Sequence, residues 1–369
     1  MDILWITPRR FGADMCQTTQ IGAGKALSRM NHSVTFLSPQ SQEFQPIAGL
    51  NFLELVFSPR FSFQTLGMEV SIRKNLRMIL DSTPFDICIV EWQLANSSSQ
   101  ILLEKSIPWV ILDRSPPIPT GIKGRIQELH YRNSWGRASG SDGACVKSQH
   151  LLDHLSGIYE MPEKTSVMPS GVDLDIFEKP RPKSLQLKVV YHGRLDKLRD
   201  IDAIVQACTV LNSTGEEVSL LLFGEGDLAP SLFRKAEVTS WMEVLGRVPA
   251  DSVPDLLSSC HIGVIPLPDL KIWHHSSPLK MFEFAASGLC VVATDIPCHR
   301  SIGERPWMTL YDPRERIDGI VQSINHLSRS GKISELSQIA RTDSENDFTW
   351  DKSIKDLNSM IISILDQTQ

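Results

Sequence analysis

Basic residues do not predominate in this sequence, which has 37 Lys and Arg against 43 Asp and Glu and a formal net charge of -6. Without a basic excess, nucleic acid is a poor expectation as a partner. The sequence has 7 cysteines, and their spacing contains no C-x-x-C pair. That spacing argues against both a disulfide framework and a cysteine-based zinc site, so we expect reduced, buried thiols.

Long apolar runs are also missing. No stretch approaches the roughly 20 apolar residues that a helix needs to cross a bilayer, and the apolar run at residues 3–6 is shorter than a signal peptide requires. We therefore predict a cytoplasmic protein, and leave open a peripheral contact with the inner face of a membrane. The hydrophobic fraction of 41% is typical of a globular chain.

Short apolar runs alternate with longer amphipathic ones along the chain, which favours βα units and parallel sheets. A length of 369 residues suits two domains. A charged, proline-containing segment at 178–184 interrupts the alternation, which restarts at 187. We predict an α/β fold with two Rossmann-like domains, at 1–178 and 187–347, joined by a linker at 179–186. Residues 348–369 are predicted to form a C-terminal helix that packs back on the first domain.

Single elements can be predicted from the same patterns. Continuous apolar runs are typical of strands buried on both faces, and they occur at 87–90, 109–112, 262–265 and 290–294. The run at 52–57 predicts another strand. Apolar residues at helical spacing predict one amphipathic helix over 350–365.

The segment 275–288 predicts a helix with a sharp start. Ser277 is a good N-cap, Pro278 suits the first helical position and Gly288 is a natural stop. A helix that begins in this way presents free N–H groups and the positive end of its dipole, which together favour a bound phosphate.

The first turns of this helix carry the candidate ligand groups. The N–H groups of Leu279 and Lys280 are those we expect to be free. Glu283 lies one turn deeper on the same face and could accept hydrogen bonds from the two hydroxyls of a ribose. The alternative is a capped helix whose Glu283 is only solvated.

Two arginines follow the strand predicted at 187–191. An apolar strand ends at Gly193, and Arg194 and Arg199 lie in the loop after it. Two guanidinium groups at a strand end can clamp a diphosphate, although a solvated loop is the alternative. Because arginines and a helix terminus can neutralise phosphates, we predict neither a metal nor a cofactor.

A strand predicted at 218–223 runs into Gly224-x-Gly226, where the missing side chains would let the backbone approach a ligand closely. With Ala229 this segment also fits the dinucleotide fingerprint G-x-G-x-x-A, which is a weak match in isolation.

Acidic residues end two strands of the first half. Glu91 follows 87–90 and Asp113 follows 109–112, and either could orient or deprotonate an acceptor hydroxyl. The alternative is a strand-end carboxylate that caps a helix or pairs with Arg114. Gly12, in the loop after the first strand, is predicted to contact substrate.

One part of the first half is basic although the whole chain is acidic. Glu128 is the single acid among the basic residues Arg114, Lys123, Arg125, Arg132 and Arg137. A second basic cluster lies on a predicted helix at 73–80 and contains Arg73, Lys74 and Arg77. These clusters indicate either a solvated face or attraction to an anionic lipid surface or a phosphorylated acceptor.

Taken together, the motifs resemble those of glycosyltransferase family 4, the retaining nucleotide-sugar transferases of glycosyl transferases group 1 with GT-B architecture. In chain order, the similar segments are Pro169-Ser-Gly-Val-Asp173, Gly193-Arg194 with Arg199, Gly224-x-Gly226, Leu245-Gly-Arg-Val248, Pro278 to Asp295, and Phe348-Thr-Trp350. The resemblance is weak over residues 1–165. It implies parallel sheets that face a central cleft.

The resemblance also implies a reaction. A hexosyltransferase of this family moves a hexose-type sugar from a nucleoside-diphosphate sugar, with retention, to a hydroxyl of a glycan, lipid-linked or small-molecule acceptor. It implies that Arg194 and Arg199 hold the pyrophosphate and that Glu283 holds the ribose. The N–H groups of Leu279 and Lys280 would then cap the β-phosphate. The base would lie near Gly224–Gly226 and the backbone of Arg247–Val248.

Departures from the family pattern leave alternatives open. His275 stands where the family has the first glutamate of E-x7-E, which faces the transferred sugar, so sugar preference and activity itself are both open. Arg199 replaces a lysine, and Ser170 replaces an asparagine. The alternatives are a nucleotide-sugar epimerase or hydrolase on the same scaffold, and an inactive nucleotide-sugar-binding protein.

Overall fold

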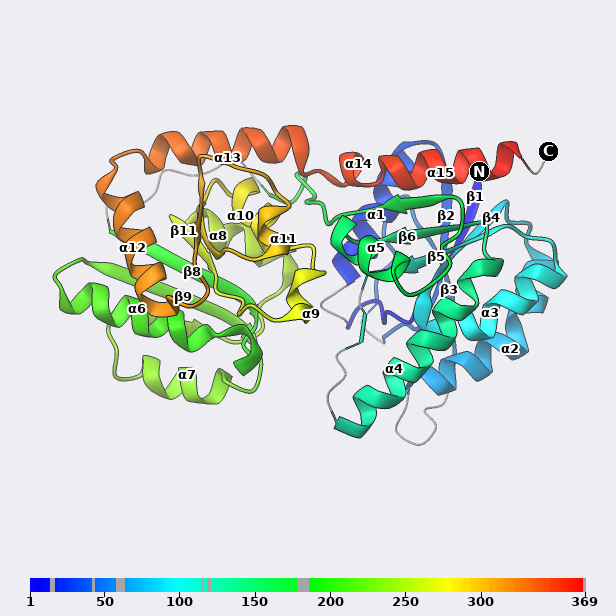
Figure 1. The fold of residues 1–369 in the computed structure, drawn as a ribbon, viewed down its shortest axis with the longest axis horizontal. Coiled ribbons are helices and arrows are strands. Elements are labelled where there is room, and N and C mark those ends of the chain that lie inside the picture. The colour runs from blue at the N-terminus through cyan, green and yellow to red at the C-terminus, as the bar shows by residue number, and fades with distance from the viewer. Residues whose placement is uncertain are drawn as a thin grey trace. The chain divides into compact units, whose positions relative to one another are not determined.

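The computed structural model describes residues 1–13, 17–41, 44–57, 64–114, 116–117, 121–177 and 186–367. The chain divides into two compact units (Figure 1). Unit 1 contains Met1–Gly171 and Trp350–Gln369, and unit 2 contains Val172–Thr349. Apart from its last residue, the linker predicted at 179–186 lies outside the described residues.

Unit 1 is built on a 7-stranded sheet in the order β3-β2-β1-β4-β5-β6-β7. The strands are β1 (Asp2–Ile6), β2 (Ser33–Ser38), β3 (Asn51–Glu54), β4 (Ile87–Glu91), β5 (Trp109–Asp113), β6 (Gly143–Val146) and β7 (Thr165–Val167). Neighbouring strands are parallel. The helices are α1 (Thr18–Arg29), α2 (Gln64–Ser82), α3 (Trp92–Glu104), α4 (Gly121–Gly136), α5 (Gln149–Ser156), α14 (Trp350–Ser353) and α15 (Lys355–Asp366), with a short 3-10 helix, η2 (Ala138–Gly140).

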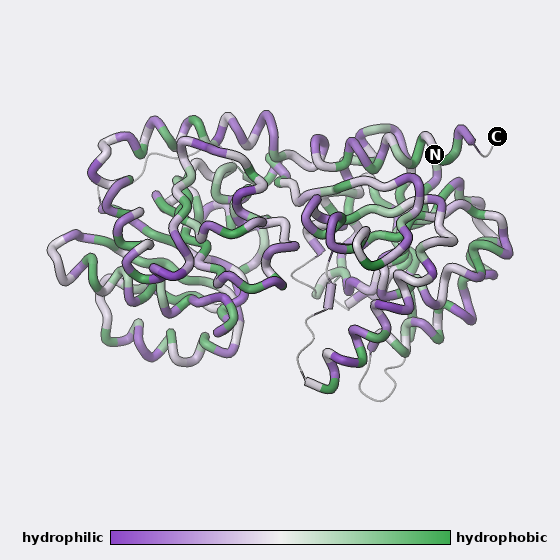
Figure 2. The backbone as a smooth tube through the Cα atoms, in the orientation of Figure 1, coloured by the Kyte–Doolittle hydropathy of each residue, from purple (hydrophilic) through white to green (hydrophobic). Residues whose placement is uncertain are grey.

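The apolar runs predict the central strands of unit 1 correctly. Every residue of β4 and β5 is buried, and Figure 2 shows the strands of this sheet as mainly hydrophobic. The strand predicted at 52–57 is shorter, since β3 ends at Glu54. The helix at 121–136 was not predicted, because only four of its residues, Gly124, Tyr131, Ser134 and Trp135, are buried.

The C-terminal segment belongs to unit 1. The indole of Trp350 lies against Gly22 of α1, and Arg29 of α1 forms an ion pair with Asp351 (2.7 Å). The side chains of Met360 and Ile364 lie over Gly143 at the start of β6. The segment forms two helices that meet at Ile354, instead of the one helix predicted over 350–365.

Unit 2 is built on a 6-stranded sheet in the order β10-β9-β8-β11-β12-β13. The strands are β8 (Leu187–Arg194), β9 (Val218–Glu225), β10 (Met242–Leu245), β11 (Ile262–Ile265), β12 (Cys290–Thr294) and β13 (Met308–Tyr311). The α-helices are α6 (Ile201–Ser213), α7 (Ala229–Ala236), α8 (Val253–Ser258), α9 (Lys271–His274), α10 (Leu279–Ala286), α11 (Pro297–Arg300), α12 (Arg316–Arg329) and α13 (Ile333–Asp347). Short 3-10 helices are η3 (Lys197–Arg199) and η4 (Ala250–Ser252).

Helices cover both faces of this sheet. Side chains alternate along β8, so that Val189 and Tyr191 join the core under α6 and α12, while Val190 joins the core under α10 and α13. Neighbouring strands are again parallel. Both sheets therefore agree with the predicted Rossmann-like architecture.

The boundaries of unit 2 differ from the predicted 187–347. Residues 172–177 precede the predicted linker but belong to unit 2, because the N–H of Val172 donates to Phe348 O (2.8 Å) and Phe177 is buried in its core. The sequence places the boundary too late because the charged segment at 178–184 is a stronger compositional signal than this single backbone pairing.

Candidate functional site

The sheet of unit 2 has a topological switch point between β8 and β11. From β8 the chain crosses through α6 to β9 on one side, and from β11 it crosses through α10 to β12 on the other. Open parallel sheets bind ligands outside the carboxyl ends of their strands at such a point. Here this edge carries His192–Arg194 at the end of β8 and Leu279–Glu283 at the start of α10. We call these two segments the β8–α10 junction.

The two segments of the junction meet at Gly193. Its φ is 104°, and a Cβ at this position would lie 2.9 Å from Cε and 3.0 Å from Nζ of Lys280. Glycine is therefore the residue that leaves room for the ammonium group of Lys280. The sequence predicts a role only for the N–H of Lys280, whereas in the structure its side chain reaches the end of β8.

Gly224 on β9 lies directly beside Gly193. A Cβ at Gly224, whose φ is 135°, would lie 1.8 Å from the carbonyl oxygen of Gly193. A Cβ at Gly226 would lie 2.2 Å from Leu195 O. The two glycines of the G-x-G segment therefore allow two backbone segments to approach each other. The sequence predicts that these positions are glycine because the backbone approaches a ligand. The structure shows that they are glycine because the backbone approaches Gly193 and Leu195.

The end of β10 continues this edge of the sheet. The N–H of Gly224 donates to Gly246 O (3.0 Å), which places Arg247 and Val248 beyond the neighbouring strand end. Nη1 of Arg247 lies 4.0 Å from Oε1 of Glu225. The predicted base-binding segments thus lie next to each other within unit 2.

Tyr191 links the cationic residues of the site. Its side chain is buried, its hydroxyl donates to Arg194 O (2.9 Å), and Nζ of Lys280 lies 5.6 Å from its ring centroid. Burial raises the pKa of Tyr191 to about 12, against the charge and hydrogen bond of Arg199, which lower it. One buried, neutral side chain therefore lies close to the cationic groups of Arg199 and Lys280 and holds the backbone of Arg194.

The guanidinium group of Arg194 binds the carboxylate of Asp196. Nε lies 3.0 Å from Oδ2 and Nη2 lies 3.1 Å from Oδ1, and this hydrogen bonding raises the pKa of Arg194. The side chain is 52% exposed. Asp196 therefore occupies the two parallel N–H groups that would fit two phosphate oxygens.

Arg199 lies over the indole ring of Trp273 on α9, with Cζ 4.7 Å from the ring centroid. Such cation–π stacking holds a guanidinium group in place while leaving its edges open to acceptors. His275 is the C-terminal cap of α9, two residues after Trp273. His275, which replaces the first glutamate of E-x7-E, therefore lies on the same short segment as Trp273, the stacking partner of Arg199.

The start of α10 differs from the prediction. Its N-cap is Pro278, and not Ser277, because Pro278 has a φ of −80° and a ψ of 82°. This conformation folds the N–H of Leu279 back onto Ser277 O (3.0 Å), as in a γ-turn. The prediction of a free N–H group at Leu279 is therefore wrong, and the cation at the junction is the side chain of Lys280.

Glu283 lies beside His192 of β8. Their Oε2 and Nε2 atoms are 3.2 Å apart, and both side chains are largely buried. His192 is held by stacking on Phe223 (5.2 Å between centroids) and by an edge contact with Phe284. His192 is not among the residues predicted from the sequence, although its place between Tyr191 and Gly193 at the end of a predicted strand was a signal.

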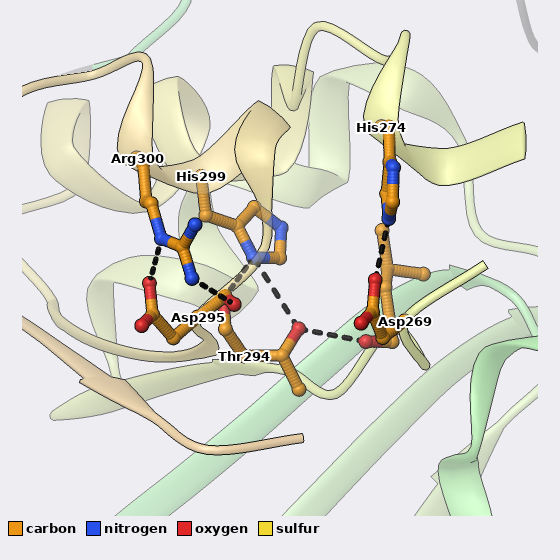
Figure 3. A network of polar contacts seen from close by, with 7 residues as sticks. Asp269, His274, Thr294, Asp295, His299 and Arg300 are labelled. Carbon is orange, nitrogen blue, oxygen red and sulfur yellow. Dashed lines mark hydrogen bonds and ion pairs between the residues drawn. The ribbon is translucent and has the colours of Figure 1, made fainter. Parts of the chain in front are cut away.

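A polar network connects the loops that follow β11 and β12 (Figure 3). Thr294 Oγ1 donates to Leu267 O (2.7 Å), and Nδ1 of the fully buried His299 lies 2.7 Å from Thr294 O. Arg300 pairs with Asp295 nearby. Because the chain passes from the loop after β11 into α9 and α10, this network helps to fix the segment that carries Trp273 and Lys280.

This network gives a prediction for stability. Burial lowers the pKa of His299 from 6.5 to about 4, so the unfolded chain binds a proton in this pH range that the folded chain does not. The free energy of unfolding should therefore fall by about 3 kcal/mol between pH 6.5 and 4 through this group. His299→Asn should lose that part of the pH dependence in urea titrations. The exposed His326→Asn is the control, and equal pH dependence in the wild type and both variants would refute the assignment.

In unit 1, Asp113 ends β5 and is fully buried. Its Oδ2 accepts hydrogen bonds from the hydroxyl of Tyr131 (2.5 Å) and from Nε1 of Trp135 (3.2 Å), both on α4. Arg114 does not supply these contacts, since its guanidinium group binds Met168 O and Ser170 Oγ. Asp113 therefore anchors α4 to the end of β5.

Glu91 and Gly12 lie near the switch point of unit 1, between β1 and β4. Glu91 is the N-cap residue of α3, and its Oε1 accepts from Nε2 of Gln20 on α1 (2.8 Å). Gly12 lies in the loop after β1, where its N–H donates to Oε1 of Gln17 (2.8 Å). Glu91 and Gly12 are thus hydrogen-bonded to residues of α1 and of its N-cap.

Neither a metal-binding cluster nor a membrane-spanning helix is found in the part of the chain that the structure describes. It contains no group of three or more His, Cys, Asp or Glu side chains placed to hold a metal ion. None of its helices is both long enough and apolar enough to cross a membrane.

Comparison with known protein families finds a match within the second unit. Residues 186–330 match the family model "Glycosyl transferases group 1", which confirms the resemblance at the level of this group. No curated protein sequence matches the chain.

Solved structures resemble both units. Sucrose-phosphate synthase from Thermosynechococcus elongatus is similar with a TM-score of 0.80, 14% identity and 99% coverage of both chains. The catalytic domain of starch synthase IV from Arabidopsis thaliana, bound to ADP and acarbose, has a TM-score of 0.75, 11% identity and 99% coverage of both chains. HepE from Anabaena, in complex with UDP and glucose, has a TM-score of 0.71 and 14% identity, covering 98% of this chain and 99% of its own. The chain therefore has the GT-B fold of two Rossmann-like units.

Proposed function

From the match of its second unit to glycosyl transferases group 1, we propose that this protein is a retaining glycosyltransferase. It moves a hexose-type sugar from a nucleoside-diphosphate sugar to a hydroxyl acceptor. The observation that carries the proposal is a set of three cationic residues at the switch point of unit 2. Arg199 and Lys280 lie close to Tyr191, and Arg194 is the last residue of β8. Structurally similar proteins bound to UDP or ADP support a nucleotide donor.

The positive groups would stabilise the departing diphosphate. As the bond between the anomeric carbon and the β-phosphate oxygen breaks, negative charge grows on that phosphate, and cations already in place lower the barrier. The acceptor oxygen bonds to the anomeric carbon on the same face, and its proton passes to the leaving phosphate. A base from the protein is not required in this scheme, which agrees with the buried, doubly hydrogen-bonded state of Asp113. Glu91 remains the candidate for orienting the acceptor.

The same cations make a bound metal unnecessary for charge neutralisation, so we propose metal-independent transfer without a cofactor. Asp196 would give up Arg194 when the diphosphate binds, because a diphosphate carries more charge than one carboxylate. A cytoplasmic location remains a prediction from the sequence.

Glu283 is proposed to bind the ribose hydroxyls, oriented by its contact with His192. Glu283→Ala should therefore reduce the preference for a ribonucleoside diphosphate over its 2′-deoxy form by about tenfold, since hydrogen bonds to a charged group contribute about 1.5–3 kcal/mol. Thermal shifts with both nucleotides measure this preference. Glu243→Ala, at an exposed carboxylate of β10, is the control, and an unchanged preference in Glu283→Ala would exclude Glu283 as the ribose ligand.

The function itself is tested by incubating the protein with a panel of UDP-, GDP- and ADP-sugars, with and without hydroxyl acceptors. A glycosyltransferase releases the nucleoside diphosphate and forms a glycoside with the anomeric configuration of the donor. An epimerase yields an altered sugar nucleotide without an acceptor, and a hydrolase yields free sugar. Binding without consumption of any donor would identify an inactive nucleotide-sugar-binding protein.

A further inference from the structure

Helix α4 of unit 1 exposes a row of apolar side chains. Ile122 is 79% exposed, Ile126 46% and Leu129 61%. Their spacing of four and three residues places them on one face of the helix, and we call them the α4 ridge. Among the described helices, α4 alone has three exposed large apolar side chains. A helix of a soluble domain usually turns such residues toward the core, so the α4 ridge is a candidate contact surface.

The ridge is not needed to hold α4 in place. The opposite face supplies the buried residues Gly124, Tyr131, Ser134 and Trp135, and two of these donate to Asp113. The helix packs along α3, which in turn packs on α2 (Figure 1). The ridge residues can therefore be changed to polar ones without removing a contact that anchors the helix.

Basic side chains accompany the ridge. Lys123 and Arg125 are exposed, and neither has an ion-pair partner among the described residues. Arg132 is also exposed and bonds to Glu128 (3.2 Å), the one acidic residue of the helix. A chain with a net charge of -6 thus has a positive surface around its exposed apolar row.

The neighbouring helix α2 extends the positive surface. Arg73 and Lys74 are exposed there, whereas the exposed Arg77 forms an ion pair with Glu104 of α3 (2.6 Å). Glu69 of α2 is close enough to His130 of α4, to Arg137 just after α4, and to Arg73 for their charges to act on its carboxyl group. Basic residues of both helices therefore lie on the same side of the unit 1 sheet.

We propose that the α4 ridge docks this protein on a membrane surface that contains anionic lipid. The apolar side chains would enter the boundary between headgroups and acyl chains, while Lys123 and Arg125 pair with acidic headgroups. Charge complementarity selects this occupant. A second copy of the chain would bring two like-charged surfaces together, and a neutral surface would leave the cations unpaired.

The proposal is tested by floating the full-length protein with phosphatidylcholine vesicles made with and without phosphatidylserine. The wild type should float only with phosphatidylserine present, and added salt should weaken binding. Changing Ile122, Ile126 and Leu129 together to Ser should lower the partition coefficient by about tenfold or more. Lys123→Glu with Arg125→Glu should lower it to a similar extent, since each basic residue near an anionic surface contributes about fivefold.

Matched variants on unit 2 separate a docking surface from general effects of charge and hydropathy. Arg234→Glu with Lys235→Glu on α7 makes the same change in net charge, and Val238→Ser removes an apolar side chain that is 85% exposed. Both controls should float like the wild type. The proposal is overturned if the wild type does not bind, if neutral vesicles bind equally, or if the α4 and α7 variants lose binding equally. A wild-type dimer that the ridge variant dissociates, without vesicle binding, would assign the surface to self-association instead.

Discussion

Arg194→Ala is expected to lower kcat/KM for sugar transfer by roughly 10²- to 10³-fold, as the loss of one donor to a developing oxyanion does. Arg194 ends β8 at the switch point, its carbonyl oxygen accepts a hydrogen bond from the hydroxyl of Tyr191, and two N–H groups of its guanidinium already bind the carboxylate of Asp196. Removing it leaves the charge of the departing phosphate less compensated, so kcat should fall more than the affinity for the donor.

The matched control for this prediction is Arg329→Ala on α12. Arg329 is an exposed arginine of the same unit that also pairs with a carboxylate, that of Glu216 (2.8 Å). It lies away from the β8–α10 junction and should leave kcat/KM unchanged. Arg194→Lys should retain an intermediate rate, because a lysine keeps the charge but not the paired N–H geometry. Turnover by Arg194→Ala within a factor of about two of the wild type would remove Arg194 from the phosphate site.

Lys280→Met is expected to weaken binding of the nucleoside diphosphate by at least about tenfold and to lower kcat as well. Methionine keeps most of the aliphatic chain that lies against Gly193 and Tyr191, and it removes only the charge. The loss reports on the ammonium group because charge-assisted hydrogen bonds to phosphate are about twice as strong as neutral ones. Isothermal titration with a nucleoside diphosphate measures the affinity.

Comparison of the diphosphate with the monophosphate sharpens this test. If Lys280 contacts the β-phosphate, Lys280→Met should bind the monophosphate almost as well as the wild type does and lose affinity only for the diphosphate. Lys235→Met, on the exposed face of α7, should behave as the wild type with both. An equal loss of affinity for both nucleotides would place Lys280 at a different part of the ligand.

The central strands could be predicted because burial on both faces of a parallel sheet demands continuous apolar runs. The runs at 262–265 and 290–294 correspond to β11 and β12 with the same bounds. Helix α4 could not be predicted in this way, since its exposed isoleucines and its buried Gly124 and Ser134 reverse the usual pattern. The break at Ile354 is equally hidden, because α14 and α15 bury residues at spacings that a single helix would also satisfy.

Several residues of the candidate site could be named from the sequence, but the contacts between them could not. The order of motifs placed Arg194, Glu283 and Lys280 on one sheet edge, and the structure brings Lys280 to Gly193 and Glu283 to His192. The turn at Pro278 depends on a ψ angle that no residue type determines, so the bonded N–H of Leu279 was not predictable. Contacts between strands, such as that of Gly224 with Gly193, depend on register, which one sequence does not reveal.

The most direct test of the account is the dissociation constant of the preferred nucleoside diphosphate in the presence of EDTA, measured for the wild type and for a variant that combines Arg194→Ala with Lys280→Met. If fixed cations of unit 2 hold the diphosphate, the wild type should bind it without divalent metal and the variant should bind at least about 10²-fold more weakly. Equal affinities, or binding by the wild type that requires a metal, would contradict it.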